Sequence, residues 1–247
     1  TLSSSSAASD VYKRQAQSVY YFYSYFLIKD NNKPINFSVP TGNFGDVYAG
    51  YLAKKIGLPI NKFVVATNQN DILHRAITNG AYNVENVLET ISPSMDIQIA
   101  SNFERLIFDL NNHSDKKTVE VMKSIKEEGK YEIQKELLGK INADFLSSRM
   151  DEKEVLNTIK AVYEKFNKVL DPHSAIGYGA FDKVNLKGNN IVLATAHPCK
   201  FPDAIEKAIN LKAELPNELA FVLDEKENYD IIENNLAKIK QHIKERI

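Results

Sequence analysis

The sequence contains a single cysteine, Cys199, which excludes an internal disulfide bond. A chain with so little cysteine fits a reducing compartment, and we expect a cytoplasmic location. An excess of charge of one sign is also missing, because 31 basic residues nearly balance 32 acidic ones. Such a balance lacks the basic footprint by which proteins bind nucleic acid or an anionic membrane surface. We therefore expect neither of these partners.

Long hydrophobic runs are absent as well. The longest run, 19–28, is broken by Ser24 and is much shorter than the roughly 20 residues that a membrane-spanning helix needs. Histidine, cysteine and carboxylate residues do not recur at the spacing of a metal site, so no metal is predicted. The rest is typical of a globular domain, with 43% hydrophobic and 26% charged residues.

The first fifteen residues differ from the rest of the chain. They read TLSSSSAASDVYKRQ, a serine-rich string that ends in a basic pair. The string resembles translated adapter sequence at the end of an assembled fragment, and a native disordered tail is the alternative. We set residues 1–15 apart as a non-native or disordered leader and assign residues 16–247 to the functional region. If the leader is an artefact, the native protein began well upstream.

Strand-like and helix-like segments alternate through the first part of the chain. The segment 17–28 suits an aromatic-rich helix, although a strand is equally compatible with its pattern. Strands are then expected at 35–39 and 62–66, each followed by a helix, at 44–55 and 71–78. This order predicts an α/β fold, with a parallel sheet and crossover helices.

The second part of the chain is predicted to be rich in helix. From 116 to 184 the pattern is almost entirely helical, and Asp151 with Glu154 has the spacing of a capping box. A third strand is expected at 190–195. Further helices are expected near 101 and at 201–211, 216–222 and 229–246.

The strongest chemical signal is the segment 38–46, SVPTGNFGD, in which a strand ends, a tight turn follows and a helix begins. The first N–H groups of a helix have no internal acceptor, and the helix dipole adds partial positive charge there. Gly42 and Gly45 permit unusual backbone conformations and close approach of a ligand. Together these features predict a phosphate cradle that needs no lysine or arginine.

From glycine spacing alone this cradle is a weak prediction. A plain strand-to-helix turn would use the same residues for geometry only. The segment lacks the GxxxxGK[ST] pattern of a P-loop and the GxGxxG pattern of a dinucleotide-binding turn. The surrounding sequence therefore has to decide between the two interpretations.

The longer segment 38–60, SVPTGNFGDVYAGYLAKKIGLPI, closely resembles the cofactor-phosphate loop and following helix of threonine synthases. The resemblance continues in four separate segments in the family's order. These are VVATNQNDILHRAITNGAY at 64–82, SPSMDIQIASNFERLIFDL at 92–110, LDPHSAIGYGA at 170–180 and IVLATAHPCKFPDAI at 191–205.

The resemblance implies the fold and cofactor of that family. Threonine synthases are fold-type II pyridoxal-phosphate enzymes, related to tryptophan synthase β and cysteine synthase. We therefore expect a partial parallel sheet of this type with a helix-rich C-terminal part, and pyridoxal 5'-phosphate as cofactor. The resemblance places the cofactor phosphate on the backbone N–H groups of five residues, Gly42, Asn43, Phe44, Gly45 and Asp46.

The same resemblance assigns a second cofactor contact to Thr195. In this fold type a serine or threonine hydroxyl faces the pyridine nitrogen, and a neutral partner leaves that nitrogen unprotonated. Thr195 lies at the C-terminal end of a predicted strand, where open α/β sheets bind ligands. Without the resemblance, a strand-end threonine bonded to backbone is an equally good interpretation.

Asn102 and Arg105 are candidates for substrate contact. They lie three residues apart at the start of a predicted helix and so share a face. Arg105 could pair with the phosphate or carboxylate of O-phospho-L-homoserine, or form a surface salt bridge with Glu104. His173 and His197 also lie in matching segments, and for both we favour a structural role over a catalytic one.

The family's activity is the conversion of O-phospho-L-homoserine and water to L-threonine and phosphate. Its Schiff-base lysine lies in a Ser-Phe-Lys-Asp-type segment of the N-terminal half, and this sequence has no such segment. We therefore expect a C-terminal fragment that is inactive alone, needs the missing N-terminal half and exposes apolar surface at Phe22 and Phe26. Two alternatives remain: another fold-type II lyase such as cysteine synthase, or a non-enzymatic module that binds a phosphorylated ligand.

Overall fold

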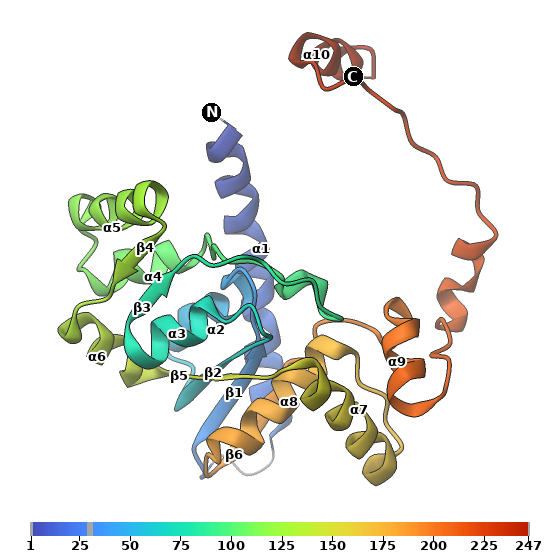
Figure 1. Ribbon diagram of the computed structural model, residues 1–247, viewed down its shortest axis with the longest axis horizontal. Helices are drawn as coiled ribbons and strands as arrows, with labels where there is room; N and C mark the ends of the chain where they lie inside the picture. Colours follow the sequence, from blue (N-terminus) through green and yellow to red (C-terminus); the bar gives the residue numbers. More distant parts are fainter. Residues whose placement is uncertain (1, 29–31, 247) are drawn as a thin grey trace. The chain divides into compact units, whose positions relative to one another are not determined.

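A parallel sheet forms the centre of the fold (Figure 1). The computed structural model describes residues 2–28 and 32–246. Neighbouring strands of the sheet are parallel, in the order β5-β2-β1-β6, so the α/β class expected from the sequence is confirmed. The strands are β1 Ile35–Pro40, β2 Lys62–Thr67, β5 Phe145–Arg149 and β6 Asn189–Val192.

Helices make up most of the remaining structure, together with a small antiparallel sheet of β3 Ala81–Asn83 and β4 Lys130–Glu132. The helices are α1 Leu2–Leu27, α2 Gly45–Lys55, α3 Ile72–Asn79, α4 Phe103–Leu110, α5 Asp115–Glu128, α6 Lys135–Asp144, α7 Glu152–Phe166, α8 Pro172–Val184, α9 Pro202–Ile209 and α10 Leu236–Lys244. Short 3-10 helices are η1 Pro93–Met95, η2 Pro198–Lys200 and η3 Asn217–Leu223. Among the described residues, no helix has the length and apolar character that crossing a membrane would require.

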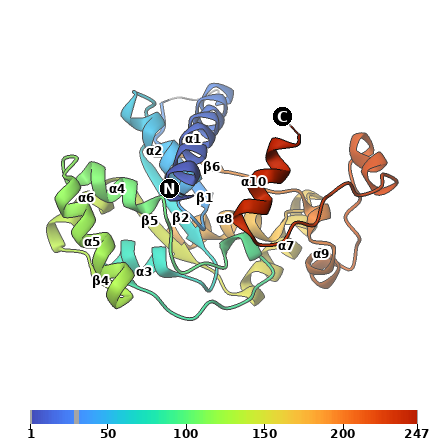
Figure 2. The ribbon, with the colours of Figure 1, turned by 90° about the horizontal axis from the view of Figure 1, so that it is seen from above.

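The two faces of the sheet carry separate apolar clusters. Along β2, Phe63 and Val65 belong to the cluster that includes residues of α1 and α2, whereas Val64 and Ala66 belong to the cluster of α7, α8 and α9. This alternation follows from the two-residue period of a strand. Figure 2 shows α1 and α2 on one side of the strands and α8 on the other. Both faces of the sheet are thus covered, as a parallel sheet requires.

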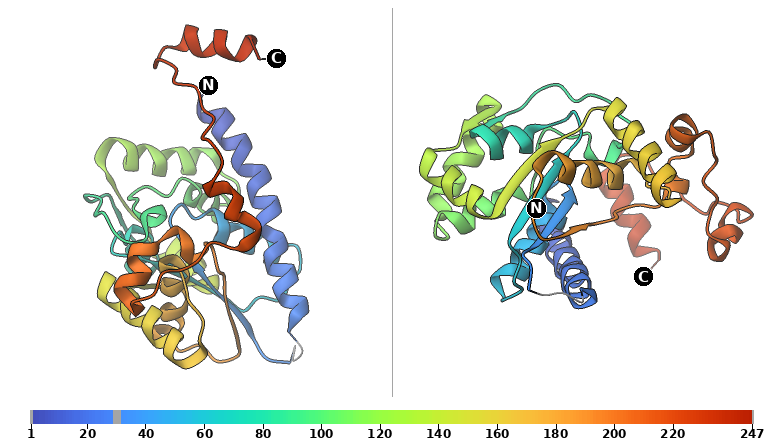
Figure 3. Two further views of the ribbon diagram at one scale, coloured as in Figure 1. Left: turned by 90° about the vertical axis from the view of Figure 1, so that its right-hand side faces the viewer. Right: turned by 90° about the horizontal axis from the view of Figure 1, so that it is seen from below.

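Helix α1 resolves the ambiguity of segment 17–28 in favour of helix. Its Tyr21 is fully buried against Phe37 and Phe63. Gly50 of α2 allows this packing, because a Cβ there would lie 2.4 Å from the Tyr21 ring. Figure 3 shows α1 running beside the strands. The helix also includes most of the leader, and the interpretation of residues 1–15 as non-native stays a prediction.

The stretch 116–184 is less helical than the sequence predicts, because β5 lies within it. The β5 sequence, FLSSR, contains no β-branched residue and directly follows α6, so neither propensity nor a turn signal marks it. Pairing with β2 makes it a strand. The capping box at the start of α7 is confirmed, since Asp151 and Glu154 each accept the other's backbone N–H.

The contacts divide the chain into two units, residues 1–213 and 214–247. The first holds the sheet and all strands. The second holds η3 and α10. Helix α10 is shorter than the predicted helix 229–246 and begins where the side chain of Asn235 accepts the N–H groups of Ala237 and Lys238.

Candidate functional site

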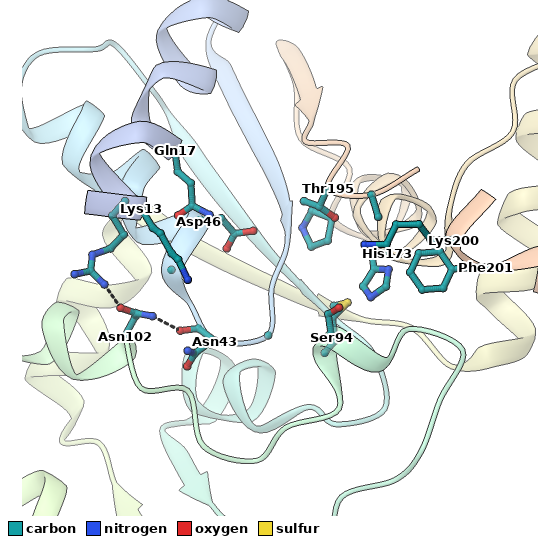
Figure 4. Close-up of a pocket in the computed structure, with 16 residues that line it drawn as sticks. Lys13, Gln17, Asn43, Asp46, Ser94, Asn102, His173, Thr195, Lys200 and Phe201 are labelled. Carbon is teal, nitrogen blue, oxygen red and sulfur yellow. Dashed lines mark hydrogen bonds between the residues drawn. The ribbon is translucent and has the colours of Figure 1, made fainter. Parts of the chain in front are cut away.

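A cavity of about 310 Å³ lies at the carboxyl end of β1, where parallel sheets bind ligands. It brings together residues that are far apart in the sequence (Figure 4). Most of the predicted site residues line it, and Phe44 and Arg105 do not. Those that do are Gly42, Asn43, Gly45, Asp46, Asn102 and Thr195.

The loop between β1 and α2 is held against the sheet by its first residue. The N–H of Thr41 donates to the carbonyl of Ala66 at 2.8 Å, and its hydroxyl donates to the carbonyl of Val39 at 2.6 Å. Helix α2 then begins at Gly45, so its first N–H groups, which lack intrahelical acceptors, lie at the cavity. This is the geometry of an anion site at a helix start.

The two glycines of this loop serve close approach. A Cβ on Gly42 would lie 2.6 Å from the carbonyl oxygen of Ser94, and one on Gly45 would lie 3.3 Å from Nδ2 of Asn102. The left-handed residue of the loop is Phe44, with φ of 65°. The expectation that the glycines supply the unusual backbone conformation was therefore wrong, because packing around the loop places that conformation on the phenylalanine.

Phe44 lies in the core. Its side chain is fully buried, and its ring lies 5.2 Å from that of Phe103 and 5.7 Å from that of Phe145. A left-handed conformation costs a non-glycine residue roughly 1–2 kcal/mol, and burial of the ring offsets this cost. A cofactor contact at Phe44 can therefore involve only its backbone, and that contact stays a prediction.

Asn102 ties α4 to the loop. Its Nδ2 donates to the carbonyl of Asn43 at 3.1 Å, while Oδ1 of Asn43 accepts the N–H and hydroxyl of Ser101 at 2.6 and 2.9 Å. Oδ1 of Asn102 accepts from Arg14 and, at 3.3 Å, from Nε of Arg105. Arg105 thus supports Asn102 from outside the cavity. The predicted contacts of Asn102 and Arg105 with substrate stay predictions.

Thr195 lies three residues past the end of β6, because that strand is shorter than predicted. The ladder ends after the N–H of Leu193 donates to Ser38 at 3.0 Å, since Pro40 of β1 has no N–H to continue it. The N–H of Thr195 donates to Oγ of Ser174 at 3.3 Å. Its hydroxyl has no hydrogen bond within the described part of the chain, and the residue lines the cavity. The predicted role of Thr195 at a pyridine ring stays a prediction.

The start of α8 adds His173, for which the sequence interpretation favoured a structural role over a catalytic one. Asp171 caps the helix, and its Oδ1 accepts the N–H of His173 at 2.9 Å and lies 3.1 Å from Nδ1 of the same histidine. Burial alone would raise the pKa of Asp171, but the hydrogen bonds from His173 and Ser174 outweigh it and lower the pKa.

His173 lines the cavity, as does Lys200. Lys200 follows Thr195 within one matching segment, which was the only sequence signal for it.

Asp46 is the acidic group of the cavity. Burial raises its pKa to about 6, although its carboxylate accepts the N–H of Val47 at 2.8 Å. The hydroxyl of Tyr21 donates to the carbonyl of the same residue at 2.8 Å. Below about pH 6 the carboxyl group is therefore mostly neutral, which limits its repulsion of an anion at the start of α2.

This raised pKa predicts a pH-dependent stability. Well below pH 3.8 Asp46 is neutral in both the folded and the unfolded chain, and the stability it contributes is fully present. As pH rises through about 6, ionisation in the buried position removes that contribution. We expect the loss of unfolding free energy between pH 4 and 8 to be about 1–2 kcal/mol smaller in Asp46→Asn than in the unsubstituted chain. Urea unfolding of both proteins between pH 4 and 8 measures the difference, and parallel pH profiles would contradict it.

Comparison with known proteins shows that the chain is similar to threonine synthases. A family profile described as "Threonine synthase, C-terminal" matches residues 174–243. Threonine synthase from Pseudomonas aeruginosa is 40% identical over 92% of this chain and 49% of its own length. The Saccharomyces cerevisiae threonine synthase is 39% identical over 94% of this chain and 51% of its own length. The chain thus spans about half the length of the curated relatives it matches.

Solved structures agree with this placement. The PLP-bound threonine synthase from Brucella melitensis superposes with a TM-score of 0.88, at 40% identity, over 94% of this chain and 50% of that one. Yeast threonine synthase gives a TM-score of 0.82 at 37% identity. A fungal L-serine ammonia-lyase from Rhizomucor miehei, only 11% identical, shares the fold with a TM-score of 0.51. The predicted fold class is thereby confirmed.

Proposed function

We propose that this chain, which belongs to the threonine synthase family over the half of the family's length that it spans, is the part of the enzyme that holds pyridoxal 5'-phosphate. The carrying observation is the cavity that unites the 42–46 loop with Thr195. These two elements lie far apart in the sequence. They supply the two kinds of group that the cofactor needs, an anion cradle and a neutral hydroxyl.

The residues present fit the cofactor. The first N–H groups of α2 would hold its phosphate, and the space that a Cβ on Gly42 would fill lies between the loop and Ser94. The hydroxyl of Thr195 would face the pyridine nitrogen, and Asp46 would be mostly neutral below about pH 6 beside the phosphate. When bound, pyridoxal phosphate supplies an electron sink for chemistry at the substrate's carbon atoms.

The proposed reaction of the complete enzyme converts O-phospho-L-homoserine and water to L-threonine and phosphate, in the cytoplasm. This chain would contribute cofactor and substrate binding. The Ser-Phe-Lys-Asp-type segment of the family's Schiff-base lysine is absent from its sequence. That lysine would come from the N-terminal half, so we propose that the chain alone is inactive.

The surface that the N-terminal half would cover joins α1 to β6. Strand β6 is an edge of the sheet, and a groove beside it is lined by Leu193 and by Tyr20 and Tyr23 of α1. Both tyrosines are more than 60% exposed, and Phe26 on the same helix is 75% exposed. The predicted exposure of Phe26 is confirmed. That of Phe22 was wrong, because it packs against the core cluster.

Two other functions make different demands on this cavity. Another fold-type II lyase, such as cysteine synthase, would use the same phosphate loop but a different substrate, and a substrate-specificity assay on the complete enzyme would reveal it. A binding module for a phosphorylated ligand would need neither the N-terminal half nor the pyridine contact. The relatives reported above at 37–40% identity are all named threonine synthases, which favours the proposed function.

Binding of the cofactor tests the proposal directly. We expect the chain to bind pyridoxal 5'-phosphate at least about tenfold more tightly than pyridoxal, because the loop grips the phosphate. Gly42→Ala should remove most of this preference, since the added Cβ displaces the loop or Ser94. Gly139→Ala is the matched control, because a Cβ at Gly139 meets nothing within 4 Å. Quenching of tyrosine fluorescence measures both ligands, and equal affinities would refute the phosphate cradle.

A further inference from the structure

His173 has a second nitrogen that the fold does not use. The residue is only 4% exposed, and its Nε2 is buried without a hydrogen-bond partner. Leaving a buried polar atom unpaired costs about 1–3 kcal/mol, so such atoms are uncommon unless a ligand or water completes them. The side chain lines the same cavity as the 42–46 loop. The proposed cofactor contacts, at that loop and at Thr195, do not involve it.

The contacts of His173 fix which nitrogen is available. Nδ1 lies 3.1 Å from Oδ1 of Asp171, whose other oxygen accepts the hydroxyl of Ser174. The ring also packs on Phe201, with 4.9 Å between centroids. These contacts hold the imidazole with Nδ1 toward the carboxylate and Nε2 on the opposite edge. Nδ1 is therefore engaged by Asp171, and Nε2 is the ring nitrogen that remains for a ligand.

A positive charge lies beside this ring. Lys200 lines the cavity, and its ammonium group forms no hydrogen bond or ion pair within the described residues. Figure 4 shows Lys200 next to His173 and Phe201, across the cavity from Asn43 and Asp46. The cavity therefore has two ends that suit an anion. One is the start of α2, with its free N–H groups, and the other is formed by His173 and Lys200, which we term the His173–Lys200 pair.

We propose that the His173–Lys200 pair is a second anion site, which binds the phosphate monoester of the substrate while the 42–46 loop holds the cofactor. Nε2 of His173 forms a hydrogen bond with the phosphate group, and Lys200 neutralises part of its charge. The assignment of this anion to the substrate rests on the proposed function. The anion site itself rests on the buried, unpartnered nitrogen and the adjacent lysine.

Nuclear magnetic resonance of the 247-residue chain, with inorganic phosphate as the probe, tests this site. The imidazole nitrogens of ¹⁵N-labelled histidine report His173, and the backbone amides of Gly42 and Gly45 report the loop. We expect phosphate to shift the Nε2 signal along a binding curve separate from that of the glycines. Lys200→Ala should weaken the histidine curve by about tenfold and leave the glycine curve unchanged.

Two substitutions separate binding from structural support. In His173→Asn the amide can still donate to Asp171 but nothing replaces Nε2, so phosphate affinity at this site should fall by about tenfold or more. In His173→Gln the longer amide reaches the Nε2 position, so we expect a loss of no more than about threefold. His113→Gln, at a histidine whose side chain is 70% exposed, is the control. Backbone spectra of all variants report whether α8 remains folded.

The outcomes distinguish this site from the proposed function. If Gly42 and Gly45 respond to phosphate and His173 does not, the second site is refuted and the cofactor loop stands. If His173 responds and the glycines do not, the second site stands and the cofactor loop fails. Equal losses in His173→Asn and His173→Gln would show a purely structural histidine and overturn the proposal, as would the absence of any phosphate response.

Discussion

Supplying the N-terminal half of a threonine synthase should raise phosphate release from O-phospho-L-homoserine at least about 1,000-fold over this chain alone. The chain has the cavity but lacks the segment that carries the family's Schiff-base lysine, so each half alone should remain at background. The Pseudomonas aeruginosa enzyme is a suitable source, because the chain is 40% identical to it over 49% of its length. Purified halves, mixed with pyridoxal 5'-phosphate and assayed for released phosphate, provide the measurement.

A pair of surface variants tests whether the halves meet at the groove between α1 and β6. Tyr20 lines that groove and is 61% exposed, whereas Val119 on α5 is 62% exposed and lies elsewhere. Tyr20→Asp should lower the restored activity by about tenfold or more, because it buries a charge on docking, and Val119→Asp should not. Turnover by the chain alone would show that the missing lysine is dispensable. Equal effects of the two variants would place the contact outside this groove.

Phe44→Ala should destabilise the chain by about 3–5 kcal/mol, the usual cost of removing a buried phenylalanine side chain. The ring is fully buried between Phe103 and Phe145, so its removal leaves a cavity beneath the phosphate loop. Cofactor affinity should fall as well, because the same ring anchors the turn that presents the first N–H groups of α2. Urea unfolding gives the change in stability. Phe166→Ala, at a side chain that is 48% exposed, should cost about 1 kcal/mol or less.

The backbone of Phe44 allows a second, independent check. With φ of 65°, this residue occupies a region that glycine adopts at little cost and alanine does not. Phe44→Gly should therefore be about 1 kcal/mol less destabilising than Phe44→Ala, although both remove the ring. The reverse order would mean that the left-handed conformation is not retained in the variants. A loss below about 1 kcal/mol in both would contradict the role of the ring as an anchor.

Much of the fold followed from local patterns. The segment 35–60 combined a short apolar run, a glycine-bracketed turn and an amphipathic helix, and the structure has β1 and α2 there. Asp151 and Glu154 marked the start of α7 because a capping box involves only residues three apart. Features of this kind depend on neighbours in sequence, so the sequence can specify them. Strand β5 did not follow, since only its pairing with β2 distinguishes it from the preceding helix.

The candidate site divides in the same way. The sequence by itself determined the glycine-bracketed turn, its family resemblance and the absence of the lysine segment, because these reside in contiguous residues. Only the tertiary structure decided that Phe44 anchors the core, that Asp46 has a pKa of about 6 and that His173 carries an unpartnered nitrogen beside Lys200. Burial and pairing of a side chain are set by residues far away in the chain. No local pattern encodes which of them will surround it.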